Sequence, residues 1–157
     1  MSLNRRSKVI VAIQIVGSVY ATILLLADFP GFDIGWITWL FYNVSLAVPA
    51  LGIASGLLYW AGKTAGFYGS IAAHALQIPM IFTTALAYKM AFGISVFLKV
   101  IGPTKLVELN FGVSTILVAV PGQQSAVVAA NLYALFAMMY LIRDWKKTNE
   151  QNIQSAT

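Results

Sequence analysis

Long apolar stretches separated by short polar segments are the main pattern along this chain. A helix needs about 20 such residues to cross roughly 30 Å of hydrocarbon, because it rises about 1.5 Å per residue. Four stretches meet this requirement, at residues 8–27, 36–61, 66–88 and 123–142. The pattern therefore predicts an all-α integral membrane protein, built as a four-helix transmembrane bundle.

Residues 89–122 depart from the helical pattern. Apolar and other residues alternate through 94–101, stop alternating at Gly102-Pro103-Thr104, and alternate again through 106–113. Alternation with a period of two is typical of strands. We therefore expect an extracytoplasmic β-hairpin-like loop between the third and fourth helices, with a three-stranded unit and a re-entrant segment as the alternatives.

The turn of this hairpin can be formed in two ways. A four-residue loop over 102–105 puts Pro103 at the favoured second position of a type I turn, and it sets Lys99 opposite Glu108. A two-residue Gly-Pro loop keeps the same faces in phase but sets Lys99 opposite Leu106, and proline suits it poorly. We favour the four-residue loop.

Composition supports a membrane setting. The chain is 59% hydrophobic and only 10% charged, whereas soluble domains have about 25% charged residues. The net charge of +5 does not indicate nucleic acid, since the basic residues flank the apolar stretches. By the positive-inside rule, both termini are cytoplasmic in a multi-pass protein of the plasma or inner membrane. The flanking basic residues are Arg5, Arg6, Lys8, Lys63, Arg143, Lys146 and Lys147.

The opposite, outer side receives an acidic turn with Asp28 and Asp33. We expect one domain over residues 1–147 and a polar cytoplasmic tail over 148–157. The chain has no cysteine, which excludes disulfides and thiolate metal sites. Phosphate-loop, GxSxG and HExxH motifs are also absent from the sequence, so we expect no enzyme activity, metal or cofactor.

Polar side chains occur inside each predicted span, where they are costly unless they face protein or water. An antiparallel bundle places Gln14 at the depth of His74, and Asn43 at the depth of Asn131. We expect two layers of hydrogen bonds between helices. A sharper alternative is a ligand cavity or proton path at His74, since histidine titrates near neutral pH. The candidate cluster is Gln14, Asn43, His74, Gln77 and Asn131.

Small residues recur at four-residue spacing and allow helices to approach closely. The pair Gly52 and Gly56 matches GxxxG. We expect this pair to pack within the chain rather than to form a dimer.

These features predict a small multi-pass membrane accessory or interaction protein. It would sit in the lipid bilayer and associate through its helices and outer hairpin with a membrane-protein partner or with itself. The candidate partner surface is Val107, Leu109 and Phe111. The alternative function is a small carrier or channel-like protein with a polar path near His74, Gln77, Asn43 and Asn131.

Overall fold

The computed structural model describes residues 4–27, 35–82, 87–101, 104–118 and 127–154. These residues form a mostly helical protein with four helices and a small antiparallel sheet. The predicted outer acidic turn and the hairpin loop residues 102–103 lie outside the described residues. In chain order the elements are α1 (Arg5–Ala27), α2 (Trp36–Trp60), α3 (Thr64–Gln77), β1 (Pro79–Phe82), β2 (Ala87–Ile101), β3 (Thr104–Val118), β4 (Val127–Asn131) and α4 (Leu132–Gln154).

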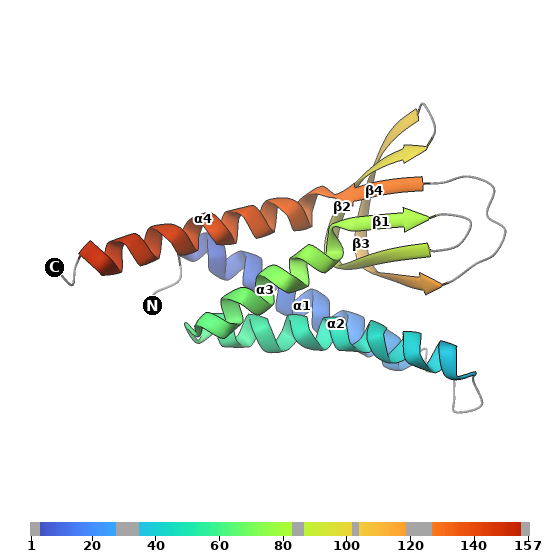
Figure 1. The fold of residues 1–157 in the computed structure, drawn as a ribbon, viewed down its shortest axis with the longest axis horizontal. Coiled ribbons are helices and arrows are strands. Elements are labelled where there is room, and N and C mark those ends of the chain that lie inside the picture. The colour runs from blue at the N-terminus through green and yellow to red at the C-terminus, as the bar shows by residue number, and fades with distance from the viewer. Residues whose placement is uncertain (1–3, 28–34, 83–86, 102–103, 119–126, 155–157) are drawn as a thin grey trace.

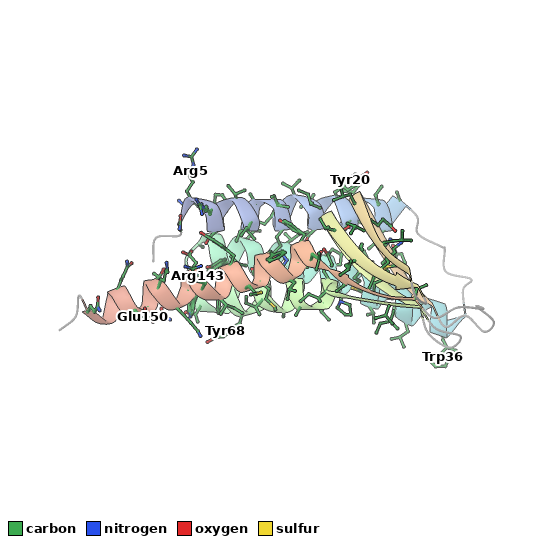
Figure 2. The ribbon with its side chains drawn as sticks, turned by 90° about the horizontal axis from the view of Figure 1, so that it is seen from above. Arg5, Tyr20, Trp36, Tyr68, Arg143 and Glu150 are labelled. Atoms are coloured by element: carbon green, nitrogen blue, oxygen red, sulfur yellow. The ribbon has the colours of Figure 1, made fainter. Side chains whose placement is uncertain are left out.

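The molecule is elongated, with both chain ends at one end and the sheet toward the other (Figure 1). We call these the helical end and the sheet end. Arg5 and Arg143 lie toward the helical end and Trp36 lies at the opposite end (Figure 2). The sheet packs beside α1 and α2, because Met90 of β2 forms a buried cluster with Ala21 and Val48. The sheet therefore lies alongside the second half of α1 and the first half of α2.

Two helical segments are long and apolar enough to cross a membrane, Arg5–Ala27 and Tyr42–Trp60. Length and composition are the only criteria met here, and they support membrane association in a limited way. The predicted four-span bundle is not confirmed.

The third predicted span is shorter than expected and changes type. α3 ends at Gln77, and residues 79–82 form β1 instead of continuing the helix to residue 88. Ile78, just before Pro79, still has helical dihedral angles, but Pro79 lacks the N–H that an inner helical turn requires and is tolerated as the first residue of a strand. Pro79 therefore ends the helix here rather than kinking it.

The fourth predicted span also begins later than expected. Residues 127–131 form β4, and α4 begins at Leu132 rather than near residue 123. The apolar part of α4 up to Ile142 is then only about 16 Å long. At this junction Asn131 donates its backbone N–H to the Ile78 carbonyl, at 2.8 Å. The two helix-to-strand transitions are therefore bonded to each other.

Close helix packing depends on glycine, as the sequence predicted. A Cβ at Gly52 would lie 2.2 Å from Ser18 Oγ, and one at Gly56 would lie 2.6 Å from Ile15 Cγ1. Both glycines thus pack against α1 within the chain. At Gly66 a Cβ would lie only 2.0 Å from the Tyr59 backbone nitrogen.

The turn between α2 and α3 explains this close approach. Gly62 has φ of 74° and donates to the Tyr59 carbonyl at 2.8 Å, while Lys63 donates to the Leu58 carbonyl at 2.9 Å. These two bonds form a Schellman motif, which ends a helix with glycine in the left-handed region. α3 therefore turns back immediately onto the last turn of α2.

The sheet partly closes on itself. β1 pairs with β4, β4 pairs with β2, and β1 also pairs with the start of β2, while β3 pairs along β2. Ile101 lies opposite Thr104, so the connection has two residues and the predicted four-residue loop is wrong. Lys99 consequently faces Leu106, the arrangement that we disfavoured. Extending the ladder to the shorter loop adds paired backbone groups, which offsets the poor fit of proline.

Aromatic side chains fill the core of the helical end. Val11, Tyr59, Phe67 and Leu141 form a buried cluster. The Phe67 and Trp145 rings stack with centroids 4.3 Å apart and planes 8° apart. Trp145 thus joins α4 to α3.

Candidate functional site

Gln14 makes the hydrogen bonds that join α1 to α2. Its Nε2 donates to the Gly52 carbonyl at 2.8 Å and to Ser55 Oγ at 3.1 Å, and the side chain is buried. The predicted layer of hydrogen bonds between Gln14 and His74 does not form. Gln14 bonds to the Gly52 carbonyl instead, because α1 packs closely against α2 at this glycine. Gln14 is thus part of the packing between the first two helices.

The other helical members of the predicted cluster are not joined into one path. Asn43 donates to the Trp39 carbonyl of its own helix at 2.8 Å, and Gln77 donates to the Ala73 carbonyl at 3.1 Å. His74 is buried, and neither ring nitrogen has a hydrogen-bond partner in the part of the chain that the structure describes. Gln14 Oε1 and Asn131 Nδ2 are also buried without a partner among the described residues, but His74 is the member for which neither side-chain nitrogen is bonded.

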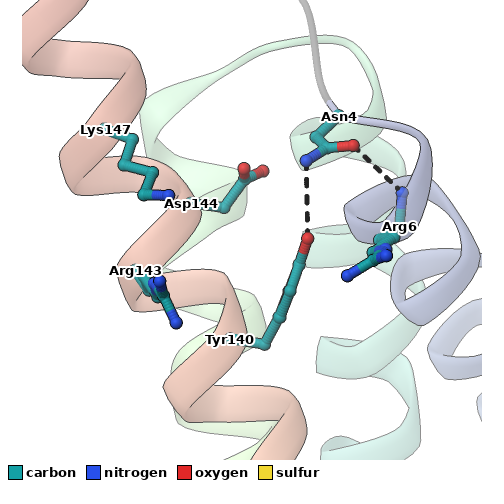
Figure 3. A pocket seen from close by; sticks show the side chains of 6 residues that line it. All are labelled: Asn4, Arg6, Tyr140, Arg143, Asp144 and Lys147. Atoms are coloured by element: carbon teal, nitrogen blue, oxygen red, sulfur yellow. Dashed lines mark hydrogen bonds between the residues drawn. The ribbon is translucent and has the colours of Figure 1, made fainter.

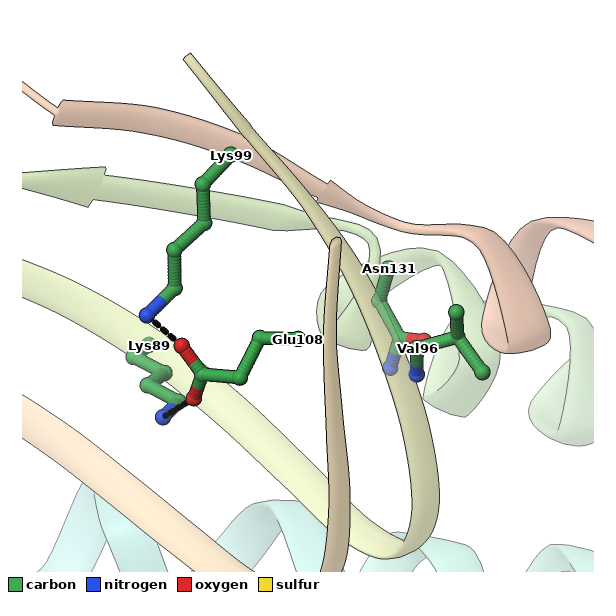
Figure 4. Close-up of polar contacts among 5 residues, drawn as sticks. All are labelled: Lys89, Val96, Lys99, Glu108 and Asn131. Carbon is green, nitrogen blue, oxygen red and sulfur yellow. Dashed lines mark hydrogen bonds and ion pairs between the residues drawn. The ribbon is translucent and has the colours of Figure 1, made fainter. Parts of the chain in front are cut away.

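Asn131 holds the junction between sheet and helix. Its Oδ1 accepts from the Val96 backbone N–H at 3.2 Å and from the Ala134 N–H at 3.4 Å (Figure 4). The second contact places Asn131 as the N-cap of α4, a position that asparagine favours. Its role is to end β4 and begin α4, and it does not pair with Asn43 as predicted.

An ionic cluster lies on the inner face of the curved sheet (Figure 4). Glu108 forms an ion pair with Lys99 and a second one with Lys89, at 3.8 Å. The Lys89 ammonium also lies 5.2 Å from the centroid of the buried Phe97 ring. The predicted pair of Lys99 and Glu108 is present, but it is diagonal, because Phe97 occupies the position opposite Glu108.

The register explains which side chains share that face. Residues directly opposite in antiparallel strands point to the same side, and side chains alternate along each strand. Lys99 therefore shares a face with Leu106 and Ala129, its two partners on β3 and β4. The enclosed face includes Met80, Lys89, Ser95, Phe97, Lys99, Glu108, Ala129 and Asn131.

The outer face of the same sheet is apolar; it is buried against α1 and α2 at Met90 and exposed farther along the strands. Val107 is 66% exposed and Leu109 is 64% exposed, as the predicted partner surface requires. Leu98 and Val128 add to this face from β2 and β4. Phe111 belongs to β3, but its side chain lies outside the described residues. The inside of this sheet therefore combines a buried apolar cluster of Met80, Ala91, Phe97 and Ala129 with the ion pairs of Glu108, whereas the described outer side chains are apolar.

One edge of β3 pairs with no other described strand, while α1 and α2 also contact β3. β1, β2 and β4 use both of their edges, at least in part, by pairing with one another and with β3. Among the described strands, β3 pairs only with β2. A strand edge presents unpaired N–H and C=O groups that are a template for another strand.

A second site, which the sequence reasoning missed, lies at the helical end. Side chains from α1 and α4, with Asn4 just before α1, surround a cavity of about 250 Å³ (Figure 3). We call this cavity the basic pocket. Its lining is Asn4, Arg6, Tyr140, Arg143, Asp144 and Lys147. Asn4 Nδ2 donates to Tyr140 Oη at 3.4 Å, and Ser7 Oγ donates to the Asp144 carboxylate.

A shallow, open groove on the surface of α4 adjoins the basic pocket, and all of its lining residues belong to this one helix. It has a volume of about 380 Å³ and shares Arg143 and Lys147 with the pocket. Its remaining lining is Met139, Ile142, Lys146 and Glu150. We call it the α4 groove.

Comparison with protein families, with curated proteins and with solved structures found no match to this chain. Function therefore has to be argued from the two sites themselves.

The basic pocket had a partial signal in the sequence. Arg143 and Lys147 are one helical turn apart, and Arg6 lies near the other chain end. The positive-inside rule accounted for all three as flanking charges. Only the fold shows that α1 and α4 bring them to one cavity.

Proposed function

We propose that the protein is a small multi-pass membrane interaction protein, which associates with a second copy of itself through strand addition at β3. The observation that carries this proposal is the open β3 edge, next to an exposed apolar face. A membrane setting is supported in a limited way by α1 and α2. We take the helical end as cytoplasmic, in line with its basic residues.

The polarity of the sheet fits this setting. Strands that face lipid have apolar residues outside and polar residues inside. The sheet follows this order, with Val107 and Leu109 outside and the Lys99–Glu108 pair inside. It also lies beside the apolar helices that we place in the bilayer. An open strand edge in lipid leaves backbone groups without partners, at several kcal/mol each. A second strand removes this cost.

A second copy is the simplest source of that strand. Two β3 edges related by a two-fold axis pair in antiparallel fashion, and an isologous interface presents the same patch on both subunits. The outer faces of the two sheets then join into one apolar surface. Such pairing adds main-chain hydrogen bonds and requires no new pocket.

Cysteine cross-linking tests this proposal, because the natural chain has no cysteine. With the protein in native membranes, we expect Val107→Cys to give an oxidant-dependent adduct of twice the chain mass. Val128→Cys is the matched control, since Val128 is 55% exposed on the same face but lies on β4, away from the open edge. It should remain monomeric.

An adduct of Val107→Cys with a different protein would refute self-pairing and identify the partner. Absence of any adduct from Val107→Cys and Leu109→Cys would overturn the proposed association at β3. Equal dimerisation of Val107→Cys and Val128→Cys would indicate random collision and would also contradict it.

A carrier or channel-like function is the second candidate, and one observation favours it. His74 is 2% exposed and its ring nitrogens lack partners among the described residues. Buried polar groups normally have a hydrogen-bond partner, and an exception calls for an explanation such as a ligand or a proton path. Asn43, Gln77 and Asn131 bond elsewhere, which weakens the continuous path.

A further inference from the structure

The basic pocket and the α4 groove lie next to each other at the helical end and share Arg143 and Lys147. We propose that together they bind an anionic phospholipid, with the phosphate in the basic pocket and one acyl chain along the α4 groove. The inference goes beyond association at β3 and uses different residues. It shares with the proposed function only the membrane setting.

Charge and shape favour a phosphate in the basic pocket. Arg6 and Arg143 come from different helices and face one cavity (Figure 3). Arginine binds phosphate through paired N–H groups, and Lys147 adds a third cation. Asp144 is the only carboxylate in the lining, so positive charge is in excess. A volume of about 250 Å³ accommodates a headgroup rather than a single ion.

Asp144 favours a headgroup that carries hydroxyl groups. Its carboxylate already accepts the Ser7 hydroxyl and so can accept hydroxyl donors in this place. A carboxylate beside a phosphate repels a bare anion but accepts hydrogen bonds from headgroup hydroxyls. A glycerol headgroup offers two such hydroxyls. We therefore choose phosphatidylglycerol as the probe.

The α4 groove distinguishes a lipid from a free anion. Met139 is 54% exposed and lies with Ile142 in the groove, next to the two cations that the groove shares with the pocket. Cationic side chains near a membrane surface extend their apolar stems along hydrocarbon and keep the charge at the headgroup. Basic pockets between helices on the cytoplasmic side are known to bind anionic headgroups. A soluble phosphate would leave this groove unused.

Titration of the full chain in detergent tests the proposal, with native mass spectrometry and thermal unfolding as readouts. We expect phosphatidylglycerol to bind at least about tenfold more tightly than phosphatidylcholine with the same chains. Glycerol 3-phosphate at the same concentration should neither bind nor stabilise. Equal affinity for the two lipids would overturn the proposal. Binding of glycerol 3-phosphate as tight as that of the lipid would also overturn it, because the groove would then contribute nothing.

Matched variants separate the site from general surface charge. Arg143→Gln should weaken phosphatidylglycerol binding by about tenfold. Lys63→Gln removes an exposed charge that lines neither cavity and should leave binding unchanged. If Arg143→Gln does not fold, Arg6→Gln takes its place. Equal losses in the pocket and control variants would refute a defined headgroup site.

The acyl-chain part has its own pair of variants. Met139→Ser and Leu57→Ser each remove an apolar side chain that is about half exposed on a helix, at 54% and 56%. We expect only Met139→Ser to weaken lipid binding. Equal behaviour of the two variants would remove the groove from the site and with it the assignment to a lipid.

Discussion

At the helical end, Tyr59, Phe67 and Leu141 fill an apolar core, whereas at the sheet end the enclosed face combines an apolar cluster with the ion pairs of Glu108. On the outside, the basic pocket opens at the helical end, and Val107 lies exposed on the sheet. A helix pairs its own backbone, so its side chains can be packed freely. A sheet has edges, and β3 leaves one open. The difference shows why association is proposed at the sheet end and ligand binding at the helical end.

The largest effect should come from disturbing the close packing at the helical end. Gly66→Ala puts a Cβ against the Tyr59 backbone, which cannot move without separating α2 from α3. We expect a loss of about 3 kcal/mol or more of unfolding free energy. Gly35→Ala is the control, because a Cβ there meets nothing within 4 Å. Thermal unfolding in detergent measures both variants, and similar melting temperatures would contradict the close packing.

An intermediate effect should come from the inner face of the sheet. Glu108→Gln leaves Lys89 and Lys99 without their counter-ion in a partly enclosed space. We expect a loss of about 1–3 kcal/mol, below that of a fully buried pair because solvent reaches the cluster. Glu150→Gln, an exposed change on α4, should have little effect.

A second change tests the cause of that loss. Adding Lys99→Met to Glu108→Gln removes one of the two unpaired cations and should restore part of the stability. If the double variant is less stable than Glu108→Gln, or if Glu150→Gln is equally harmful, the ionic cluster does not stabilise the sheet.

The smallest effect on stability should come from His74. Its ring nitrogens have no described partners, so His74→Leu removes an unsatisfied buried group and should change stability by no more than about 1 kcal/mol. The same variant tests the carrier, with proton flux into liposomes as the measurement. Loss of proton flux in His74→Leu with unchanged folding would support the carrier function. Equal flux in the variant and the natural chain would rule that function out, and so would the absence of flux from both proteins.

Much of the helical end could be predicted from the sequence, because helix signals are local. The apolar run of α1, the packing of Gly52 and the turn at Lys63 all follow from neighbouring residues. α3 and α4 were harder, since Pro79 and Asn131 can each sit within a span or end one. Strand partners 30 residues or more away decide between these outcomes.

The sheet end shows the limit of local reasoning in a different way. Alternation predicted the strands of residues 89–122 and their apolar face, and Lys99 does pair with Glu108. The closing strands β1 and β4 were missed, because each is short and was hidden in an apolar run that also suits a helix. The basic pocket was missed because the positive-inside rule already explained its basic residues as charges that flank membrane spans.

The bond from the Asn131 N–H to the Ile78 carbonyl has a mechanical consequence. It joins the point where α3 becomes β1 to the point where β4 becomes α4, and the β1–β4 ladder continues from there. We expect a displacement of α4 along its axis to be resisted by these bonds, which tie it to β1 and α3. α4, which lines the basic pocket, and the sheet are therefore rigidly connected at Asn131.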